Sequence, residues 1–588
     1  MKILSVLLAL YIILGTVMGF PEAYQHRIIF VTFILVIGIL HYPLGGGERT
    51  LFKITDAILI LCVAVVGIYS ATHSEELYLK SGFSTWFEAI LCLVFIIAIL
   101  EVTRRAMGLP LPVLTFLFII YSFYGQYFPE PLTHAGYDIF AFTDVQFLTL
   151  NGIFSIPIGA SATYIVAFIL FGSLFLKTGL ADYMFDIAYA LFGSRTAGPA
   201  KVAVISSGFI GSVSGSAAAN VATTGAVTIP LMKRMGYPPE TAGAIEATAS
   251  SGGQFMPPIM GASAFIIAMY LGIPYLKVAA AAAIPAILYY LSVGTSVHIL
   301  ARKFRLPTMK KEECPPLKQA LKKSYSFLPL AIVVAVLISG STPMLAGFYA
   351  IVSVLVIALV DRNLRSNIQT FVDGLYEGVI NTLPVALACA SAGIVVGVIT
   401  LTGLGYMMSS ILLSVAKSNL LLLLGLCMVA ALVLGMGMTT VGVYVLLAVL
   451  VAPALIKLGV VELAAHFFPF YYGIISAITP PVAVASYTAA GIAKSNPFKT
   501  SVEALKIGLP AFIIPWFFAI FPGLVLHGSP LDILVATVIT LVELSIITIA
   551  VHGWFRRNLS YLERAGLIVL FLVIYYLSII SISHLKLV

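Results

Sequence analysis

The chain has 588 residues, of which 61% are hydrophobic and 10% are charged, and its mean hydropathy is +1.08. Soluble domains carry about 25% charged residues, so this composition excludes a soluble enzyme, a disordered chain and a disulfide-bonded secreted scaffold. The formal net charge of +8 does not indicate nucleic-acid binding, because the basic residues lie in short loops between apolar runs, where they set membrane topology. We therefore predict an all-α, multi-pass membrane protein embedded in the lipid bilayer.

Five apolar runs open the chain and predict five helices, at about 3–19, 28–42, 54–71, 86–103 and 110–128. The first run lacks a small-residue cleavage site, so we interpret it as a retained helix and not as a signal peptide. The loops alternate in charge, with Glu75 and Glu76 on one side and basic residues on the other, namely Arg49, Lys53, Arg104 and Arg105. This alternation predicts a cytoplasmic N-terminus, and the five predicted helices form an N-terminal helical region over 1–144.

The middle of the chain, 301–370, is predicted to form a basic cytoplasmic loop followed by a connecting helix pair. Its basic residues are Arg302, Lys303, Arg305, Lys310, Lys311, Lys318, Lys322 and Lys323. Apolar runs at about 325–340 and 345–360 follow, and Arg362 and Arg365 return the chain to the cytoplasm. Apolar runs near 508–527, 531–552 and 566–585 close the chain, and 529–588 is predicted to hold extra C-terminal helices.

An internal repeat relates 145–300 to 371–528. Thr178-Gly179-Leu180 recurs as Thr402-Gly403-Leu404, and Pro257-Pro258 recurs as Pro480-Pro481. Five such landmarks occur in the same order, at offsets of 223 to 225 residues. Five apolar runs lie between the equivalent residues Gly179 and Gly403, and this odd number of crossings predicts that the second copy is inverted. Inverted repeats are typical of transporters that work by alternating access.

Each repeat carries two places where a helix cannot continue. The first is a glycine- and hydroxyl-rich stretch between two short apolar segments, at 211–220 and 435–440, which predicts the tip of a re-entrant hairpin. The second is a broken helix around a Pro-Pro pair, at 250–258 and 476–483. Small residues also serve close helix packing, but four such motifs at duplicated positions favour a binding site, because unwound backbone at membrane depth must line a cavity or bind a ligand.

Freed carbonyls and hydroxyl groups are oxygen ligands that suit Na⁺, whereas helix N-termini suit a carboxylate. We therefore predict one Na⁺ site per repeat, where the tip meets the broken helix, and an anionic substrate between the two tips. The candidates for substrate binding are Ser216, Asn220, Gln254 and Thr440. Glu246, which precedes the first break, is an alternative carrier of a proton.

Other chemistries find no support in the sequence. The five cysteines show no metal-ligand spacing, so no metal site other than Na⁺ is predicted. No nucleophile–base pair and no phosphate-binding loop are present, so we predict neither an enzyme nor an organic cofactor.

Five motifs resemble the membrane component of a tripartite ATP-independent periplasmic (TRAP) transporter. They are GSVSGSAAAN at 211–220, KRMGYPPETAGA at 233–244, GGQFMPP at 252–258, GMGMTT at 435–440 and ITPPVAV at 478–484. The resemblance to the large membrane subunit covers roughly 145–528. The N-terminal region is similar to the small subunit, fused on one chain, and the extra C-terminal helices resemble the branch served by TAXI-type binding proteins.

The resemblance implies a Na⁺-driven elevator in the prokaryotic cytoplasmic (inner) membrane, which imports organic anions, commonly carboxylates, delivered by an extracytoplasmic TAXI-type substrate-binding protein. It assigns Na⁺ binding to Ser212, Ser214, Ser216, Gly252, Gly253, Met256, Gly435, Gly437, Thr439, Thr440, Thr479, Pro480 and Val482. Two positions depart from the family pattern, Ile259 in place of serine and Ala483 in place of glycine. The alternatives are a carrier that is independent of a binding protein or coupled to protons and, as the weaker one, an intramembrane enzyme.

Overall fold

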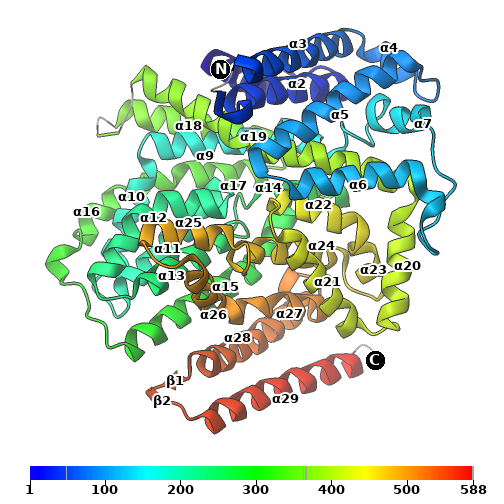
Figure 1. Ribbon diagram of the computed structural model, residues 1–588. Helices are drawn as coiled ribbons and strands as arrows, with labels where there is room; N and C mark the ends of the chain where they lie inside the picture. Colours follow the sequence, from blue (N-terminus) through cyan, green and yellow to red (C-terminus); the bar gives the residue numbers. More distant parts are fainter. Residues whose placement is uncertain (48–49, 362, 365–366, 586–588) are drawn as a thin grey trace. The chain divides into compact units, whose positions relative to one another are not determined.

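The computed structural model describes all residues except 48–49, 362, 365–366 and 586–588 (Figure 1). Arg49, Arg362 and Arg365, which entered the topology prediction, lie outside the described residues. The described chain is helical apart from one antiparallel pair of two-residue strands, β1 (Trp554–Phe555) and β2 (Arg557–Asn558). Within the described residues, ten helices are long and apolar enough to cross a membrane, which confirms the prediction of an all-α, multi-pass membrane protein.

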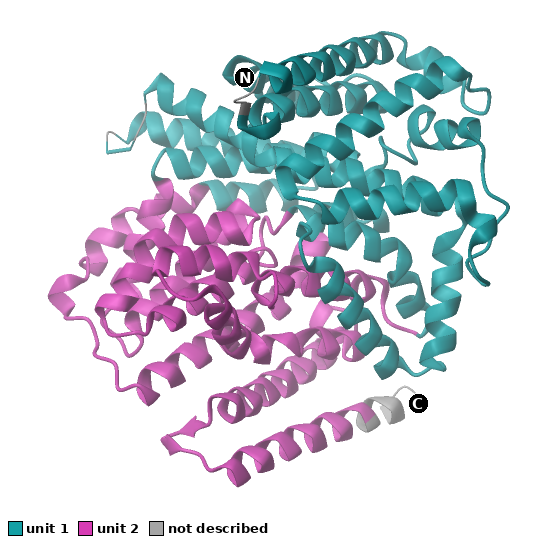
Figure 2. Cartoon of the chain, in the orientation of Figure 1, with its two compact units in different colours: residues 1–179, 262–275, 329–458 teal, residues 180–261, 276–328, 459–588 magenta. Residues whose placement is uncertain are grey.

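The chain forms two compact units, each assembled from three separate stretches of sequence (Figure 2). Unit 1 comprises 1–179, 262–275 and 329–458, and unit 2 comprises 180–261, 276–328 and 459–588. The division at 144, 300, 370 and 528 that we derived from the sequence follows the order of the chain and stays a prediction.

Unit 1 holds the five predicted N-terminal helices. Its helices are α1 (Lys2–Met18), α2 (Ala23–His41), α3 (Thr50–Thr72), α4 (Ser74–Leu79), α5 (Trp86–Met107), α6 (Pro110–Tyr124), α7 (Ile139–Thr143), α8 (Ile156–Ala160), α9 (Val166–Lys177), α14 (Ala262–Leu271), α17 (Leu328–Ile338), α18 (Pro343–Val360), α19 (Ile368–Thr402), α20 (Leu404–Ala416), α21 (Leu420–Gly435), α22 (Thr440–Leu450) and α23 (Ala452–Lys457). The 35-residue α19 lies at its centre and packs against α1, α5, α6, α9 and α22. Gly374 and Gly378 allow this packing, since a Cβ on either would lie within 3 Å of a Leu174 or Leu170 side chain on α9.

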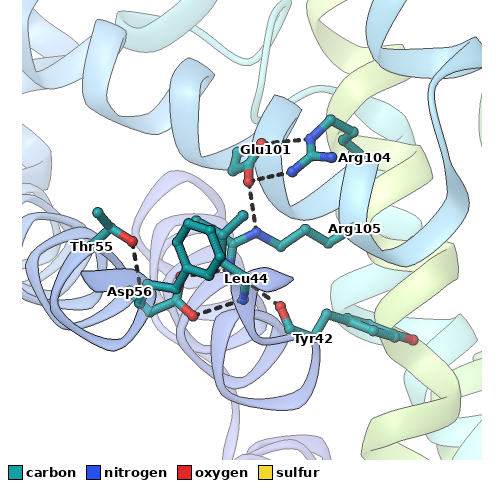
Figure 3. Close-up of polar contacts among 8 residues, drawn as sticks. Tyr42, Leu44, Thr55, Asp56, Glu101, Arg104 and Arg105 are labelled. Carbon is teal, nitrogen blue, oxygen red and sulfur yellow. Dashed lines mark hydrogen bonds and ion pairs between the residues drawn. The ribbon is translucent and has the colours of Figure 1, made fainter. Parts of the chain in front are cut away.

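A network of four charged side chains fixes the end of α5 to the end of α2 and to α3 (Figure 3). Arg105 donates to Asp56 Oδ1 (2.7 Å), to the Tyr42 carbonyl (3.2 Å) and to Glu101 Oε1 (2.8 Å). Glu101 also accepts two bonds from Arg104 (2.8 and 2.9 Å). The Arg105 side chain is only 7% exposed. Two carboxylates therefore balance two guanidinium groups, and the buried arginine donates three hydrogen bonds to two carboxylates and a carbonyl.

Unit 2 is built around α13. Its helices are α10 (Leu180–Phe192), α11 (Gly198–Ser214), α12 (Ala217–Arg234), α13 (Pro239–Gly253), α15 (Tyr275–Lys303), α16 (Leu317–Lys322), α24 (Glu462–Ile475), α25 (Val484–Ala493), α26 (Pro497–Phe512), α27 (Ile514–Ile520), α28 (Pro530–His552) and α29 (Tyr561–Leu585). The helices α11, α12, α25 and α26 surround α13, which is buried from Thr241 to Gly253. Its Ala, Gly, Ser and Thr residues let these four helices approach closely.

Candidate functional site

The first predicted tip is a true interruption between α11 and α12. Gly215 ends α11 in the left-handed conformation (φ +64°), and its N–H donates to the Gly211 carbonyl. Ser216 is extended and caps α12, because its hydroxyl accepts from Ala219 N (3.4 Å). Glycine tolerates a left-handed backbone and serine is a preferred N-cap, so the Gly-Ser pair accounts for the break.

The first broken helix is interrupted between α13 and α14. Pro257-Pro258 forms a cis peptide bond, and Met260 has a positive φ of 66°. The loop is closed by a hydrogen bond from Gly261 N to the Gln254 carbonyl (2.6 Å). Eight residues, 254–261, therefore leave the helical path between the two helices.

Tip and broken helix meet at two glycines in unit 2. A Cβ on Gly253 would lie 2.5 Å from Gly211 Cα, and a Cβ on Gly211 would lie 2.9 Å from Gly253 Cα. Both obstacles are backbone atoms, so no side-chain rotation relieves them. Only glycine fits at either position, and the sequence assigned Gly253, but not Gly211, to the site.

Asn220 lies beside this contact. Its Nδ2 donates to the Ser207 carbonyl (2.9 Å) and would lie 2.7 Å from a Cβ on Gly211. Its side chain is fully buried, and its Oδ1 accepts no hydrogen bond from the residues that the structure describes. Buried polar atoms are nearly always paired, so this oxygen is an acceptor that a ligand can use.

The hydroxyl groups of the tip, in contrast, bond to their own helix. Ser212 donates to the Phe209 carbonyl (2.8 Å) and Ser214 to the Gly211 carbonyl (3.5 Å). Gly252 packs on Tyr289, whose Cε1 lies 2.3 Å from the position of a Cβ. Gln254 is buried, whereas Met256 is partly exposed.

The carboxyl group of Glu246 ties three helices together. Ser207 on α11 donates to Oε1 (2.7 Å), Ser250 on α13 donates to Oε1 (3.1 Å), and Thr224 and Thr228 on α12 donate to Oε1 and Oε2. Glu246 has no exposed surface, and no Lys or Arg of the described chain forms an ion pair with it. The four hydroxyls thus take the place of a counter-charge.

This network was missed by the sequence analysis, which considered Glu246 alone. A signal was present: Thr224 and Thr228 are four residues apart, as are Glu246 and Ser250, and this spacing places each pair on one face of a helix. The contact between these two helix faces depends on tertiary packing, which local sequence patterns do not predict.

The second predicted tip is interrupted as well. The helix α21 ends at Gly435 and α22 begins at Thr440. Gly437 has a φ of +87°, and Thr439 caps α22 by accepting from Gly442 N (3.3 Å). This tip belongs to unit 1, where a Cβ on Gly437 would lie 2.8 Å from Pro110 Cγ.

The second broken helix belongs to unit 2. It runs through α24, a 3₁₀ turn at Ser476–Ile478 and α25, with a cis bond at Pro480-Pro481. The Thr479 hydroxyl donates to the Ile475 carbonyl (2.9 Å), and Val482 is partly exposed. Ala483, where the family pattern has glycine, has a left-handed φ of +35°.

Within unit 2 the two broken helices pack against each other. The Phe255 ring, just after α13, lies 5.2 Å from Phe467, 5.5 Å from Phe470 and 5.1 Å from Tyr471, all three on α24. The structure therefore brings together the first tip and both broken helices. The second tip lies in the other unit, so the second Na⁺ site stays a prediction.

Comparison with known proteins assigns the family. Residues 94–532 match the family described as "Tripartite ATP-independent periplasmic transporter, DctM component". The chain belongs to this TRAP transporter family. It is therefore a transporter permease, and the resemblance read from the five motifs is confirmed at the level of the family.

Individual relatives of this TRAP permease are large permease proteins too. The sialic acid TRAP transporter large permease protein SiaM of Vibrio cholerae is 25% identical over 60% of this chain and 83% of the relative. The 2,3-diketo-L-gulonate TRAP transporter large permease protein YiaN of Escherichia coli is 27% identical over 56% of this chain and 76% of the relative. The C4-dicarboxylate TRAP transporter large permease protein DctM of Pseudomonas aeruginosa is 29% identical over 34% of this chain and 47% of the relative. The fusion to a small subunit and the TAXI branch stay predictions.

Proposed function

We propose that this TRAP permease imports a small organic anion, which an extracytoplasmic TAXI-type binding protein delivers, and that inward movement of Na⁺ drives the import. The protein would lie in a prokaryotic cytoplasmic membrane with its N-terminus inside. One transport domain would move against a scaffold in an elevator mechanism. The relatives that are named for sialic acid, 2,3-diketo-L-gulonate and C4-dicarboxylates support an organic acid as substrate.

The observation that carries the proposal is the contact of the first tip with the first broken helix at Gly211 and Gly253. Backbone of two interrupted helices converges there in a membrane protein, and the unpaired Asn220 Oδ1 lies beside it. Oxygen donors of this kind fit an alkali cation. The carbonyls of the tip and of 250–256, with Asn220, would hold the first Na⁺.

The second Na⁺ would be held by the equivalent segments, 435–440 and 476–483. The substrate carboxylate would be bound by polar groups next to the tips, for which Ser216, Gln254 and Thr440 are the candidates, whereas the unpaired Oδ1 of Asn220 is an acceptor and suits the cation. Helix N-termini at Ala217 and Thr440 present backbone N–H groups that favour negative charge.

Uptake by purified protein in liposomes tests the proposal. We expect accumulation of a radiolabelled organic acid only when both an inward Na⁺ gradient and the binding protein are supplied. Uptake that needs only a proton gradient would contradict Na⁺ coupling, and uptake without the binding protein would contradict delivery. The control is the same gradient of K⁺ in place of Na⁺.

A further inference from the structure

A buried carboxyl group, Glu543, lies in the C-terminal helix pair α28–α29, outside the part of the chain that matches the family. It sits on the face of α28 that also buries Ala536, Thr540 and Ile547, and none of its own surface is exposed. Neither of its carboxyl oxygens has a hydrogen-bond partner among the described residues. Since α28 is long and apolar enough to span a membrane, this group lies near the middle of a candidate membrane span.

Tyr575 on α29 faces Glu543. The two side chains interact electrostatically, and the Tyr575 hydroxyl is likewise buried and without a partner in the described chain. The Tyr575 ring is held by Phe517 on α27 (centroids 5.3 Å apart) and Phe571 (6.1 Å). Two aromatic rings therefore hold Tyr575 near Glu543, and its hydroxyl makes no hydrogen bond to the carboxyl group in the structure.

The described cations that bond to α28 lie at its C-terminal end. Arg564 donates to the Ala550 and Val551 carbonyls (2.8 and 3.1 Å), and Lys303 donates to the His552 carbonyl (2.8 Å). His552 is nine residues from Glu543, about 13 Å along a helix. These groups cap the C-terminus of α28 and do not form an ion pair with Glu543.

The remaining groups on the elements packed against α28 are also engaged elsewhere or face outward. On α26, Lys506 pairs with Glu503 (2.6 Å), and on α29, Glu563 pairs with Arg557. The hydroxyl of Thr540, one turn away on α28, donates to the Ala536 carbonyl (2.8 Å). The exposed groups are Lys499, Tyr561 and Tyr576.

We propose that Glu543 is a proton-binding site of the C-terminal helix pair. An ionised carboxylate without a counter-charge or donor is strongly disfavoured in an apolar site, whereas the neutral acid is compatible with it. Binding joins one proton from water to one carboxylate oxygen, and the negative charge disappears. A side-chain rotation would then bring the resulting O–H into a hydrogen bond with the Tyr575 hydroxyl, which also has no partner among the described residues.

Infrared difference spectroscopy of the full chain in lipid tests this site. We expect the difference between wild type and Glu543→Gln near neutral pH to contain the carbonyl band of a protonated carboxylic acid and no carboxylate band. The matched control is Glu503→Gln, because Glu503 is partly exposed and paired with Lys506; this variant should lose carboxylate bands instead. Loss of carboxylate bands in Glu543→Gln would overturn the proposal.

Tyr575→Phe provides a second measurement that keeps Glu543 in place. In protein labelled with ¹³C-glutamate, removal of the tyrosine hydroxyl should move the acid carbonyl band to higher frequency. A spectrum without any protonated-acid band that responds to Tyr575 would overturn the site, even if Glu543→Gln does not fold.

The pH dependence of unfolding supplies a third readout. If the folded state holds a proton that the unfolded state releases, stability falls as pH rises. The melting temperature of wild type should therefore drop more steeply than that of Glu543→Gln between about pH 6 and about pH 9. Parallel curves for the two proteins would contradict the proposal.

Discussion

At the scale of single residues, the site depends on positions where no side chain fits. Gly211 and Gly253 approach through their backbones, and Gly215 and Gly437 adopt left-handed conformations at the two tips. These glycines are what allows a helix to stop inside the membrane and to meet another interrupted helix. Hydroxyl groups close to the tips, such as those of Ser212 and Ser214, mainly satisfy their own helix.

We expect Gly253→Ala to weaken Na⁺-dependent uptake. The new methyl group would meet Gly211 Cα at 2.5 Å, and relieving such an overlap costs about 1–3 kcal/mol. The tip should move away from the broken helix, so the Na⁺ concentration for half-maximal uptake should rise. The matched control is Gly294→Ala on α15, where a Cβ meets nothing within 4 Å; equal uptake by the two variants would show that the contact is irrelevant to Na⁺.

The contribution of Glu246 to stability depends on the four hydroxyl groups that donate to its carboxyl group. In Glu246→Gln an amide nitrogen replaces one carboxylate oxygen and cannot accept a hydrogen bond, so either the bond from Thr228 or the three bonds to the other oxygen are lost. Leaving a buried donor unpaired costs about 1–3 kcal/mol, so we expect a lower melting temperature in detergent. Thr228→Ser, which keeps the hydroxyl, is the control and should stay close to wild type. If Glu246→Gln has the same melting temperature as wild type, the four hydrogen bonds contribute little to stability.

At the scale of elements, the helices could be predicted from the sequence, but the ion pairs and hydrogen bonds that join one helix to another could not. Runs of apolar residues are sufficient to place α2, α3 and α5 to within about five residues at each end. A helix that crosses the bilayer needs about 20 consecutive apolar residues, and such a run is visible in the sequence. The interruptions after Ser214 and Gly435 were predictable because glycine and hydroxyl residues cluster there. The connection from Arg105 to Asp56, in contrast, joins residues 49 positions apart, and nothing in local periodicity pairs them.

We expect Arg105→Lys to destabilise the N-terminal helices. A lysine cannot bond Asp56, Glu101 and the Tyr42 carbonyl at once with the planar geometry of arginine. Breaking one side of a buried ion pair costs roughly 3–5 kcal/mol, and a retained ammonium group should recover part of this. Arg104→Lys is the control, because Arg104 is 42% exposed and pairs only with Glu101, and exposed pairs contribute about 0–1 kcal/mol. Equal melting temperatures for the two variants would contradict the role of the network.

At the scale of the whole molecule, sequence order and spatial order differ. The internal repeat is read along the chain, whereas each compact unit combines stretches from both copies. Phe255 from the first repeat packs on Phe467 and Tyr471 from the second. Composition and motif spacing therefore predict the fold class and the segments of the site. Which segments share a unit is decided by long-range packing, which those patterns do not contain.

The central position of α13 has a consequence for biogenesis. Its partners α25 and α26 are encoded late, because 230 residues separate Gly253 from Val484. At synthesis rates of about 5–20 residues per second, the ribosome needs on the order of ten to fifty seconds to produce them. During this interval the nascent α13 can pack on α11, α12 and α15, but the part of its surface that α25 and α26 cover stays unshielded. Membrane insertion of this protein therefore has to tolerate, or be assisted through, a long-lived half-assembled stage.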